Sequence, residues 1–418
     1  MSLQSFIEVA ADSDFPLENL PFGVFQPKSA AARVGVAIGE LVLDLSVLEE
    51  SGHLGGAEFR DHRVFGNDSL NAFLALGRPA WRKTREILQH LLAAETATLR
   101  DDPALRDRAF HRQVDVQMLL PARIGDYTDF YSSYHHAQNV GTMLRGADNA
   151  LMPNWKWLPV AYHGRASSIV VSGTPVRRPK GQIKPPDAAE PIFSASRAFD
   201  YELETAFLIG PGNSLGQPVP IDQAAEHIFG MVLMNDWSAR DIQTWEYQPL
   251  GPFLAKNFCT SISPWVVTLD ALEPFRRPLA PQDPQPLEYL RGNEDFTYDI
   301  RLEAKLQTAA MATPHLITRT NFQNLYWSIA QQLAHHTVGG CNLQPGDLLA
   351  SGTISGPTED SRGCMLELTR RGANPISLPG GETRKWLEDD DQLTVTGWCE
   401  GDGFRVGFGE VTGKILPS

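Results

Sequence analysis

The sequence has little of what marks a secreted, membrane or nucleic-acid-binding protein. It has four cysteines among 418 residues, far apart and without a CxxC pair, so neither a zinc site nor a disulfide framework is expected. No apolar run reaches the roughly 18 residues needed to cross a bilayer, and the N-terminus lacks the basic and apolar parts of a secretory signal. The net charge of −14 argues against nucleic acid or an anionic membrane as partner. We therefore expect a cytoplasmic protein with buried, reduced cysteines.

The composition is that of a folded protein, with 42% hydrophobic and 21% charged residues. The chain is too long for one ordinary core, which indicates one small and one large domain. Near the N-terminus the alternation of residues predicts strands at 22–25, 33–38 and 41–45. A helical pattern follows over residues 68–99, and the charged, weakly patterned stretch 101–115 comes next. We place a boundary there, giving domains 1–117 and 118–418.

Beyond residue 120, short apolar runs separated by glycine and proline predict a β-rich domain. The clearest strands are expected at 168–172, 264–268, 392–397 and 404–409. One helix is expected to begin with Asp222 as its N-cap and to carry Ala225, Ile228 and Phe229, and a second is expected over residues 321–335. Strands and helices do not alternate regularly, so the fold class is mostly β with some α rather than a doubly wound sheet.

Carboxylates in apolar surroundings are the chemical feature of the second domain. Glu202 and Glu204 alternate with apolar residues, so in a strand both side chains would point to one face. Two neighbouring carboxylates repel each other, and a hard divalent cation such as Ca²⁺ or Mg²⁺ would remove that cost. Taken alone, this pair is explained better by a solvated edge strand with two exposed acids. Asp236 ends the apolar run 231–234, where it is either a helix N-cap or a ligand at the end of a strand.

The acidic run 388–391 is interpreted as a solvated turn, because its adjacent acids point in different directions.

Five longer motifs are more specific than these spacings. They are GDYTDFYSS at 125–133, PVAYHGRASS at 159–168, MNDWSARDIQ at 234–243, GPFLAK at 251–256 and LASGTISG at 349–356. In this order they closely resemble the fumarylacetoacetate hydrolase family, and the resemblance includes the N-terminal domain. It implies a small SH3-like N-terminal barrel joined to a large β-roll domain, and a homodimer.

The resemblance also implies residue roles. The ligands of a catalytic Ca²⁺ or Mg²⁺ would be Asp129, Glu202, Glu204 and Asp236, and a second, structural Mg²⁺ would lie near Asp236, Lys256 and Thr260. The general base would be His136, oriented by Glu367; the adjacent His135 is the weaker candidate. The donors around the reacting oxygens would be Arg240, Gln243 and Lys256. The substrate contacts would be Tyr131, Arg145, Arg240, Tyr247 and Thr353, and Tyr162 would line the site.

The implied reaction is hydrolysis of the carbon–carbon bond of 4-fumarylacetoacetate to fumarate and acetoacetate, the last step of tyrosine and phenylalanine breakdown. The residue types suit it, because a cation stabilises the leaving enolate, a histidine can activate water, and an arginine can bind a carboxylate. One rival is an acylpyruvate hydrolase or a decarboxylase/isomerase of the same superfamily. The other is a non-catalytic metal-binding scaffold, which would be expected to lack a ligand or the base.

Overall fold

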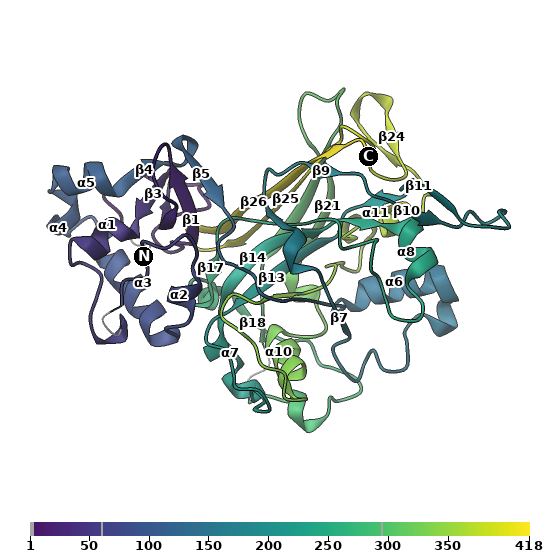
Figure 1. The fold of residues 1–418 in the computed structure, drawn as a ribbon, viewed down its shortest axis with the longest axis horizontal. Helices are drawn as coiled ribbons and strands as arrows, with labels where there is room; N and C mark the ends of the chain where they lie inside the picture. The colour runs from purple at the N-terminus through teal and green to yellow at the C-terminus, as the bar shows by residue number, and fades with distance from the viewer. Residues whose placement is uncertain (1–3, 60–61, 294–295) are drawn as a thin grey trace.

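A computed structural model describes residues 4–59, 62–293 and 296–418. Two parts lie side by side along its long axis, a smaller N-terminal part and a larger body that contains the rest of the chain (Figure 1). The predicted domains include residues 1–3, 60–61 and 294–295, which lie outside the described residues. Within the described stretches, no helix is long and apolar enough to cross a membrane.

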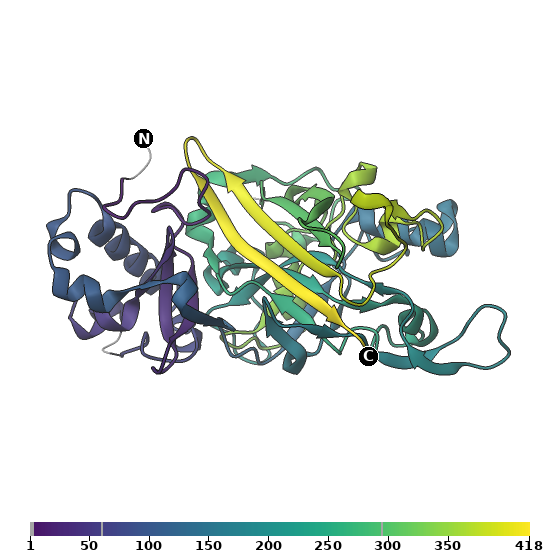
Figure 2. The same cartoon turned by 90° about the horizontal axis from the view of Figure 1, so that it is seen from above.

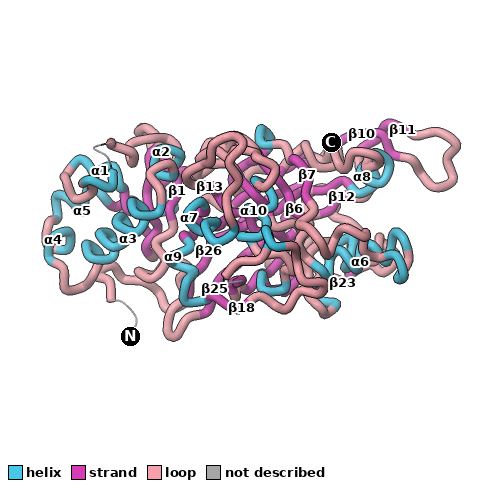
Figure 3. Tube along the Cα trace, turned by 90° about the horizontal axis from the view of Figure 1, so that it is seen from below, coloured by secondary structure: helices cyan, strands magenta, loops and turns pink. Residues whose placement is uncertain are grey.

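The N-terminal part is a curled antiparallel sheet with helices packed beside it (Figure 3). Its strands are β1 (Phe22–Pro27), β2 (Arg33–Ile38), β3 (Leu41–Asp44), β4 (Phe110–Arg112) and β5 (Val116–Leu119), in the order β4-β3-β2-β1-β5. Its helices are α1 (Leu45–Glu50), α2 (Asn71–Leu74), α3 (Arg78–Leu92), α4 (Ala97–Arg100) and α5 (Pro103–Ala109). The three predicted strands are confirmed, and the predicted helical region 68–99 consists of three separate helices.

The last strand of this sheet bears on the domain boundary. β5 pairs with β1 through Val24↔Leu119, so residues 116–119 belong to the N-terminal sheet. The two-domain division stays a proposal, and we place its junction after β5, at residues 120–126.

The body is built on an eight-stranded sheet, most of whose neighbouring strands are antiparallel. Its main path runs β7 (Ala161–His163), β6 (Tyr127–Phe130), β22 (Leu348–Ala350), β13 (Leu203–Ile209), β14 (Ile228–Asp236), β16 (Thr260–Ile262), β8 (Ile169–Val171). β17 (Val267–Thr268) also pairs with β14. The strand predicted at 168–172 is confirmed, whereas only the last two residues of the predicted strand 264–268 are assigned to a strand.

A second sheet of five strands crosses the body, and its long C-terminal hairpin is prominent in Figure 2. In sheet order its strands are β21 (His315–Asn321), β20 (Arg301–Gln307), β25 (Gln392–Glu400), β26 (Arg405–Leu416) and β9 (Val176–Arg177). Two-stranded ribbons are β10 (Lys180–Ile183) with β11 (Ile192–Ala195), β12 (Phe199–Asp200) with β15 (Ser238–Ala239), β18 (Arg276–Pro278) with β19 (Phe296–Tyr298), and β23 (Ile376–Ser377) with β24 (Thr383–Arg384). The helices are α6 (Tyr134–Arg145), α7 (Ala224–His227), α8 (Arg240–Glu246), α9 (Leu269–Leu272), α10 (Ile329–Thr337) and α11 (Met365–Leu368). The expected mostly β fold class is confirmed.

Strand β14 contributes to two cores, because one of its faces packs in the body and the other packs against the N-terminal part. Met231 and Leu233 belong to the core of the body, whereas Val232 and Met234 belong to the core shared with the N-terminal part. Phe229 belongs to this shared core too and contacts three aromatic rings of the N-terminal part. The ring centroids of Phe22, Phe73 and Trp81 lie 5.5, 5.8 and 5.1 Å from that of Phe229. A strand buried on both faces requires an unbroken apolar run, which is what residues 231–234 provide.

Two predicted helices are wrong in extent. The segment after Asp222 forms only a 3-10 turn and the four-residue α7, and Ile228 and Phe229 already belong to β14. The helix predicted over 321–335 begins only at Ile329, after a capping box at Ser328, because residues before Phe322 complete β21. In both cases pairing with a neighbouring strand prevails over the helical spacing of the apolar residues.

The predictions for the acidic run and for the cysteines are also corrected in part. Asp391 is 1% exposed and accepts two hydrogen bonds of 3.0 Å from Arg384, so the run 388–391 is not a fully solvated turn. All four cysteines are free, as expected, but Cys341 is exposed. The other three are buried.

Candidate metal and catalytic centre

Four carboxylates meet at one end of the eight-stranded sheet. Asp129 lies in β6, Glu202 directly precedes β13, Glu204 lies within it, and Asp236 ends β14. The register brings them together, since Asp129 pairs with Ala350 of β22, and β22 and β14 both pair with β13. One oxygen of each carboxylate lies within 4.8 Å of one oxygen of every other. Asp236 is at a strand end and not a helix N-cap, because α8 begins at Arg240 with Ala239 as its cap.

Burial makes this cluster electrostatically costly. All four residues are at most 5% exposed. Burial, reinforced by the charge of the neighbouring carboxylates, raises the pKa of Asp129 and of Glu204 well above the ordinary values. Burial also raises the pKa of Asp236, although the ammonium group of Lys256 opposes it. For Glu202 the charges of Lys256 and Arg240 outweigh burial and hold its pKa below the usual range.

The carboxylate oxygens of this cluster are suitable ligands for a divalent cation. Neither carboxylate oxygen of Glu204 accepts a hydrogen bond from any described residue, and Oδ1 of Asp129 likewise has no donor. Buried carboxylate oxygens without a donor are rare in folded proteins, because each one loses its hydration. A hard cation with oxygen ligands would satisfy them and relieve the repulsion between the four acids. The chemistry of these oxygen ligands therefore favours a hard divalent cation over softer metals.

The residues expected around a second cation also lie together. Lys256 donates hydrogen bonds through Nζ to Glu202 and, at 2.6 Å, to Oδ2 of Asp236. Thr260 donates to Oδ1 of Asp236 at 3.0 Å, and the hydroxyl of Tyr162 donates to Oδ2 at 3.0 Å. Both oxygens of Asp236 are thus already engaged. A second cation here would need backbone oxygens or would have to displace these bonds.

The expected histidine and its acidic partner face each other. His136, in the first turn of α6, lies 2.6 Å through Nδ1 from Oε2 of Glu367, and both side chains are buried. Glu367 alternates with Leu366 and Leu368, a spacing that predicts a strand, but residues 365–368 form the helix α11, so that prediction is wrong. Burial opposes ionisation, but His136 and the polar donors around the carboxylate keep the pKa of Glu367 below its usual value. A carboxylate at Nδ1 fixes the proton there and leaves Nε2 as the basic nitrogen.

Arg240 joins the carboxylate cluster to α11. Its guanidinium lies 2.6 Å from Glu202 and donates to Gln243 at 3.1 Å and to Oδ2 of Asp200 at 2.8 Å. Asp200 is fully buried and also accepts hydrogen bonds from the backbone N–H groups of Met365, at 2.6 Å, and Leu366, at 3.0 Å. It therefore fixes the first turn of the helix that carries Glu367.

A cavity of about 480 Å³ opens over these groups. Of the site residues expected from the sequence, the cavity is lined by Asp129, Tyr131, His136, Tyr162, Glu202, Arg240, Gln243, Tyr247, Lys256 and Thr353. Arg145 does not line it. Its guanidinium instead donates to the carbonyl oxygens of Asn149, at 3.0 Å, and Ala150, at 2.5 Å, at the end of α6. Gly352 has φ +76°, and a Cβ there would lie 2.1 Å from the carbonyl oxygen of Phe130, so only glycine fits beside Thr353.

Several residues of this centre were missed by reasoning from the sequence. Asn139 donates to Oε1 of Glu367 at 2.8 Å, and Ser355 donates to Oε2 at 2.7 Å. Asn139 could have been found, because it follows His136 by three residues on the same face of a helix. Asp200 opens the segment that contains Glu202 and Glu204, but no spacing rule indicates its link to α11. Arg371 also lines the cavity, and no motif pointed to it.

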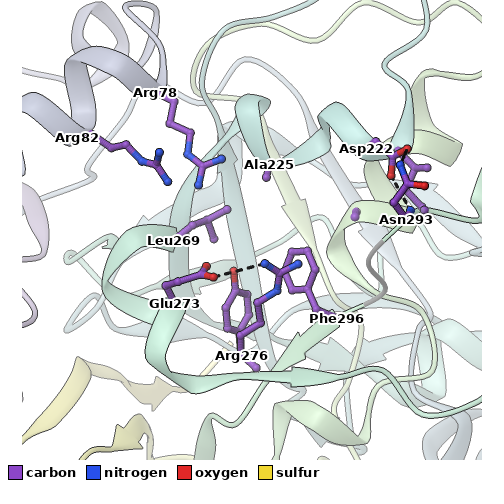
Figure 4. A pocket seen from close by; sticks show the side chains of 13 residues that line it. Arg78, Arg82, Asp222, Ala225, Leu269, Glu273, Arg276, Asn293 and Phe296 are labelled. Atoms are coloured by element: carbon purple, nitrogen blue, oxygen red, sulfur yellow. Dashed lines mark hydrogen bonds and ion pairs between the residues drawn. The ribbon is translucent and has the colours of Figure 1, made fainter.

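A second cavity, of about 420 Å³, lies between α3 and the body (Figure 4). Arg78 and Arg82 point toward it from α3, but Arg78 lies 2.7 Å from Glu226 and Arg82 lies 3.1 Å from Asp270. Arg276 lies over the ring of Phe296, 3.7 Å from its centroid, and 3.4 Å from Glu273. These cations are therefore already balanced by acids, and the cavity has none of the chemistry found in the first one.

Comparisons with known proteins agree along the whole chain. Residues 18–121 match the family described as fumarylacetoacetase N-terminal, and residues 127–415 match the one described as fumarylacetoacetate (FAA) hydrolase C-terminal. Over 417 residues the chain is 58% identical to the fumarylacetoacetase of Bos taurus, with 99% of both chains covered. It is 57% identical to that of Homo sapiens over 417 residues, again with 99% of both chains covered.

Solved structures resemble the fold at lower identity. A fumarylacetoacetate hydrolase from Exiguobacterium antarcticum is 18% identical with a TM-score of 0.53, covering 96% of this chain and 100% of its own. A maleylpyruvate hydrolase from Sphingobium is 16% identical with a TM-score of 0.51 and the same coverage. At these identities the likeness shows the fold alone.

Proposed function

The chain belongs to the fumarylacetoacetase family, and we propose that the buried carboxylate centre beneath the 480 Å³ cavity is where it carries out the family's reaction. The protein is a hydrolase that cleaves the carbon–carbon bond of 4-fumarylacetoacetate, giving fumarate and acetoacetate. The observation that supports this best is the 58% identity over the full chain to a curated fumarylacetoacetase. The expected metal donors and the expected base all line one cavity or lie directly beneath it.

The four carboxylates Asp129, Glu202, Glu204 and Asp236 would hold a Ca²⁺ or Mg²⁺ ion. When bound, such an ion would polarise the two carbonyl oxygens of a 1,3-dicarbonyl and stabilise the enolate that leaves. The unsatisfied oxygens of Glu204 support this assignment.

The bond cleavage needs a hydroxide equivalent at the fumaryl carbonyl carbon. Nε2 of His136 would take the proton from water, because Nδ1 is committed to Glu367. Glu367 would remain ionised and stabilise the imidazolium, supported by the hydrogen bonds from Asn139 and Ser355. The proton would then pass to the carbon of the leaving enolate, which completes acetoacetate.

Charge also develops on the attacked carbonyl oxygen. Arg240, Gln243 and Lys256 line the cavity and would donate hydrogen bonds to that oxyanion. Lys256 is 6% exposed, and although burial opposes its charge, Asp236 and Glu202 keep its pKa above the usual value. It would therefore remain a cation throughout the reaction. Tyr131, Tyr247 and Thr353 would position the substrate, and Tyr162 would line its pocket. Arg145 would join them once its guanidinium turns away from the carbonyl oxygens of Asn149 and Ala150.

The direct test is the loss of ultraviolet absorbance when the purified protein is mixed with 4-fumarylacetoacetate. We expect hydrolysis without chelator, its loss in excess chelator, and its return on adding Ca²⁺ or Mg²⁺. The substitution Asp129→Asn should lower the affinity for the ion measured by calorimetry. Hydrolysis that persists after the ion has been removed would refute the metal assignment.

Other members of the superfamily provide the competing function. An acylpyruvate hydrolase or a decarboxylase/isomerase would use the same carboxylates, but the N-terminal match and the full-length identity favour fumarylacetoacetate. The assay distinguishes them if acylpyruvates are compared with 4-fumarylacetoacetate, which should give the higher kcat/KM. A non-catalytic scaffold would give no turnover with either.

We further propose that the protein works as a homodimer in the cytoplasm. Exposed apolar side chains support the homodimer. Phe193, Leu250 and Phe253 are 75, 95 and 67% exposed, and a second copy of the chain would cover such a surface. Four free cysteines are consistent with a reducing compartment. Light scattering of the purified protein should give twice the mass of one chain, and a single-chain mass would refute the dimer.

A further inference from the structure

The turn that follows α11 directs an arginine to the cavity. Arg370 and Arg371 both have positive φ, 48° and 59°, which residues with a side chain rarely adopt in succession. The backbone N–H of Arg370 donates to the carbonyl of Glu367 at 3.2 Å, and that of Arg371 donates to Leu366 at 2.9 Å. These bonds fix the turn to the helix that holds Glu367. Arg371 then lines the same cavity as His136, whereas Arg370 does not.

The charge of Arg371 differs from that of the other cations near the site. Arg240 and Lys256 are each held by two carboxylates, and Arg370 lies 2.9 Å from Glu359. Arg371 forms no ion pair with any described residue. Among the described residues, the one hydrogen-bond partner of its guanidinium is the carbonyl oxygen of Met143, at 3.4 Å. Among the cations lining the cavity it is therefore the one whose charge no described carboxylate balances.

We propose that Arg371 binds a carboxylate of the substrate at the mouth of the cavity and so contributes to the enzyme's selection of diketo acids. The inference rests on the proposed function, because 4-fumarylacetoacetate carries a carboxylate at each end. A protein with a net charge of −14 needs local cations to attract such a dianion. Met143 lies two residues before Arg145, so Arg371 reaches the end of α6 that carries Arg145, the arginine expected from the family. Arg371 would thus meet one carboxylate, and Arg145 would meet the other once its guanidinium turns away from the carbonyl oxygens of Asn149 and Ala150.

The test compares Arg371→Ala with Arg370→Ala, a matched control in the same turn with the same backbone conformation. Both variants and the wild-type enzyme are assayed on three substrates, each with the divalent ion present. The three substrates are 4-fumarylacetoacetate with two carboxylates, 3,5-dioxohexanoate with one, and pentane-2,4-dione with none. We expect Arg371→Ala to lower kcat/KM for 4-fumarylacetoacetate about tenfold or more, the effect of losing one charge-assisted contact. For pentane-2,4-dione both variants should stay within about twofold of the wild type.

The pattern of loss identifies the carboxylate. A loss confined to 4-fumarylacetoacetate assigns Arg371 to the fumaryl carboxylate, and a loss shared with 3,5-dioxohexanoate assigns it to the acetoacetate end. Arg371→Lys keeps the charge and should recover part of the activity. An equal loss on all three substrates, or no loss on 4-fumarylacetoacetate, overturns the inference. A wild-type enzyme that cleaves none of the three refutes the proposed function, whatever the variants do.

Discussion

Glu204 offers a sharp test of the cation site because removing its charge should have opposite effects with and without the ion. The carboxylate is fully buried, neither oxygen accepts a hydrogen bond from a described residue, and three other carboxylates have oxygens within 4.8 Å. At roughly 5 Å and an effective dielectric constant of about 20, two like charges repel by about 3 kcal/mol. Lys256 attracts Glu204 and offsets part of this repulsion. Partial protonation of the cluster reduces it further.

In the absence of divalent ions, Glu204→Gln should therefore raise the free energy of unfolding by on the order of 2 kcal/mol. In the wild type, an ion at 100 times its Kd should add about 2.7 kcal/mol of stability, and in the variant most of this gain should vanish. The assay is urea unfolding after chelation, with and without added Ca²⁺ or Mg²⁺. Hydrolysis should fall together with the response to the ion.

Glu303 provides the control for a buried glutamate. It is 7% exposed in β20 but lies within 3.2 Å of both Arg319 and Lys305. Glu303→Gln should leave two cations without their acid, so it should lower stability and leave the response to the ion unchanged. If Glu204→Gln behaved in the same way, Glu204 would not be part of a cation site.

Three further predictions concern the base, the substrate carboxylate and pH. His136→Ala should lower kcat by roughly 10²- to 10⁴-fold while the circular dichroism spectrum and the affinity for the ion stay unchanged. His135→Ala should retain most of the activity. Substantial turnover by His136→Ala would show that His136 is not the base. Arg145→Ala should reduce kcat/KM for diketo acids much more than for neutral diketones, and equal losses would reject its carboxylate role. The carboxyls of Asp129 and Glu204 have raised pKa values in the folded state, so the folded protein holds more protons than the unfolded one above about pH 4. In chelator, their contribution to stability should thus fall as the pH rises from about 4 toward neutrality, and added Ca²⁺ should abolish that fall in urea titrations; a fall that persists with Ca²⁺ would contradict the assignment.

The sequence was sufficient to predict those strands and helices that are determined by their own residues and by the turns beside them. The strands 22–25 and 33–38 were predicted correctly because their apolar residues are bounded by turn residues. The helix predicted from Asp222 was too long, because Ile228 and Phe229 fit a helical spacing and a doubly buried strand equally well. Only the neighbouring strand β13 decides between the two, and a single segment does not reveal its neighbours.

The candidate site could be predicted in part for the same reason. The residue motifs brought together the carboxylates, His136 and Glu367 through resemblance, whereas spacing alone left Glu202 and Glu204 compatible with a solvated strand. Asp200 and Arg371 act through contacts between segments distant in the chain. Their roles follow from the placement of α11, which sequence periodicity misread as a strand.

The doubly buried strand β14 has a consequence for substitutions far from the cavity. Phe229 packs against Phe22, Phe73 and Trp81 of the N-terminal part, and the same strand ends seven residues later at Asp236. The N-terminal part therefore packs against the sheet that holds the carboxylates, and its removal would expose Phe229, Val232 and Met234 of β14. A change such as Trp81→Ala would reduce the amount of active enzyme without altering any residue that lines the cavity. Loss of activity in this protein can thus originate from residues that lie outside the cavity.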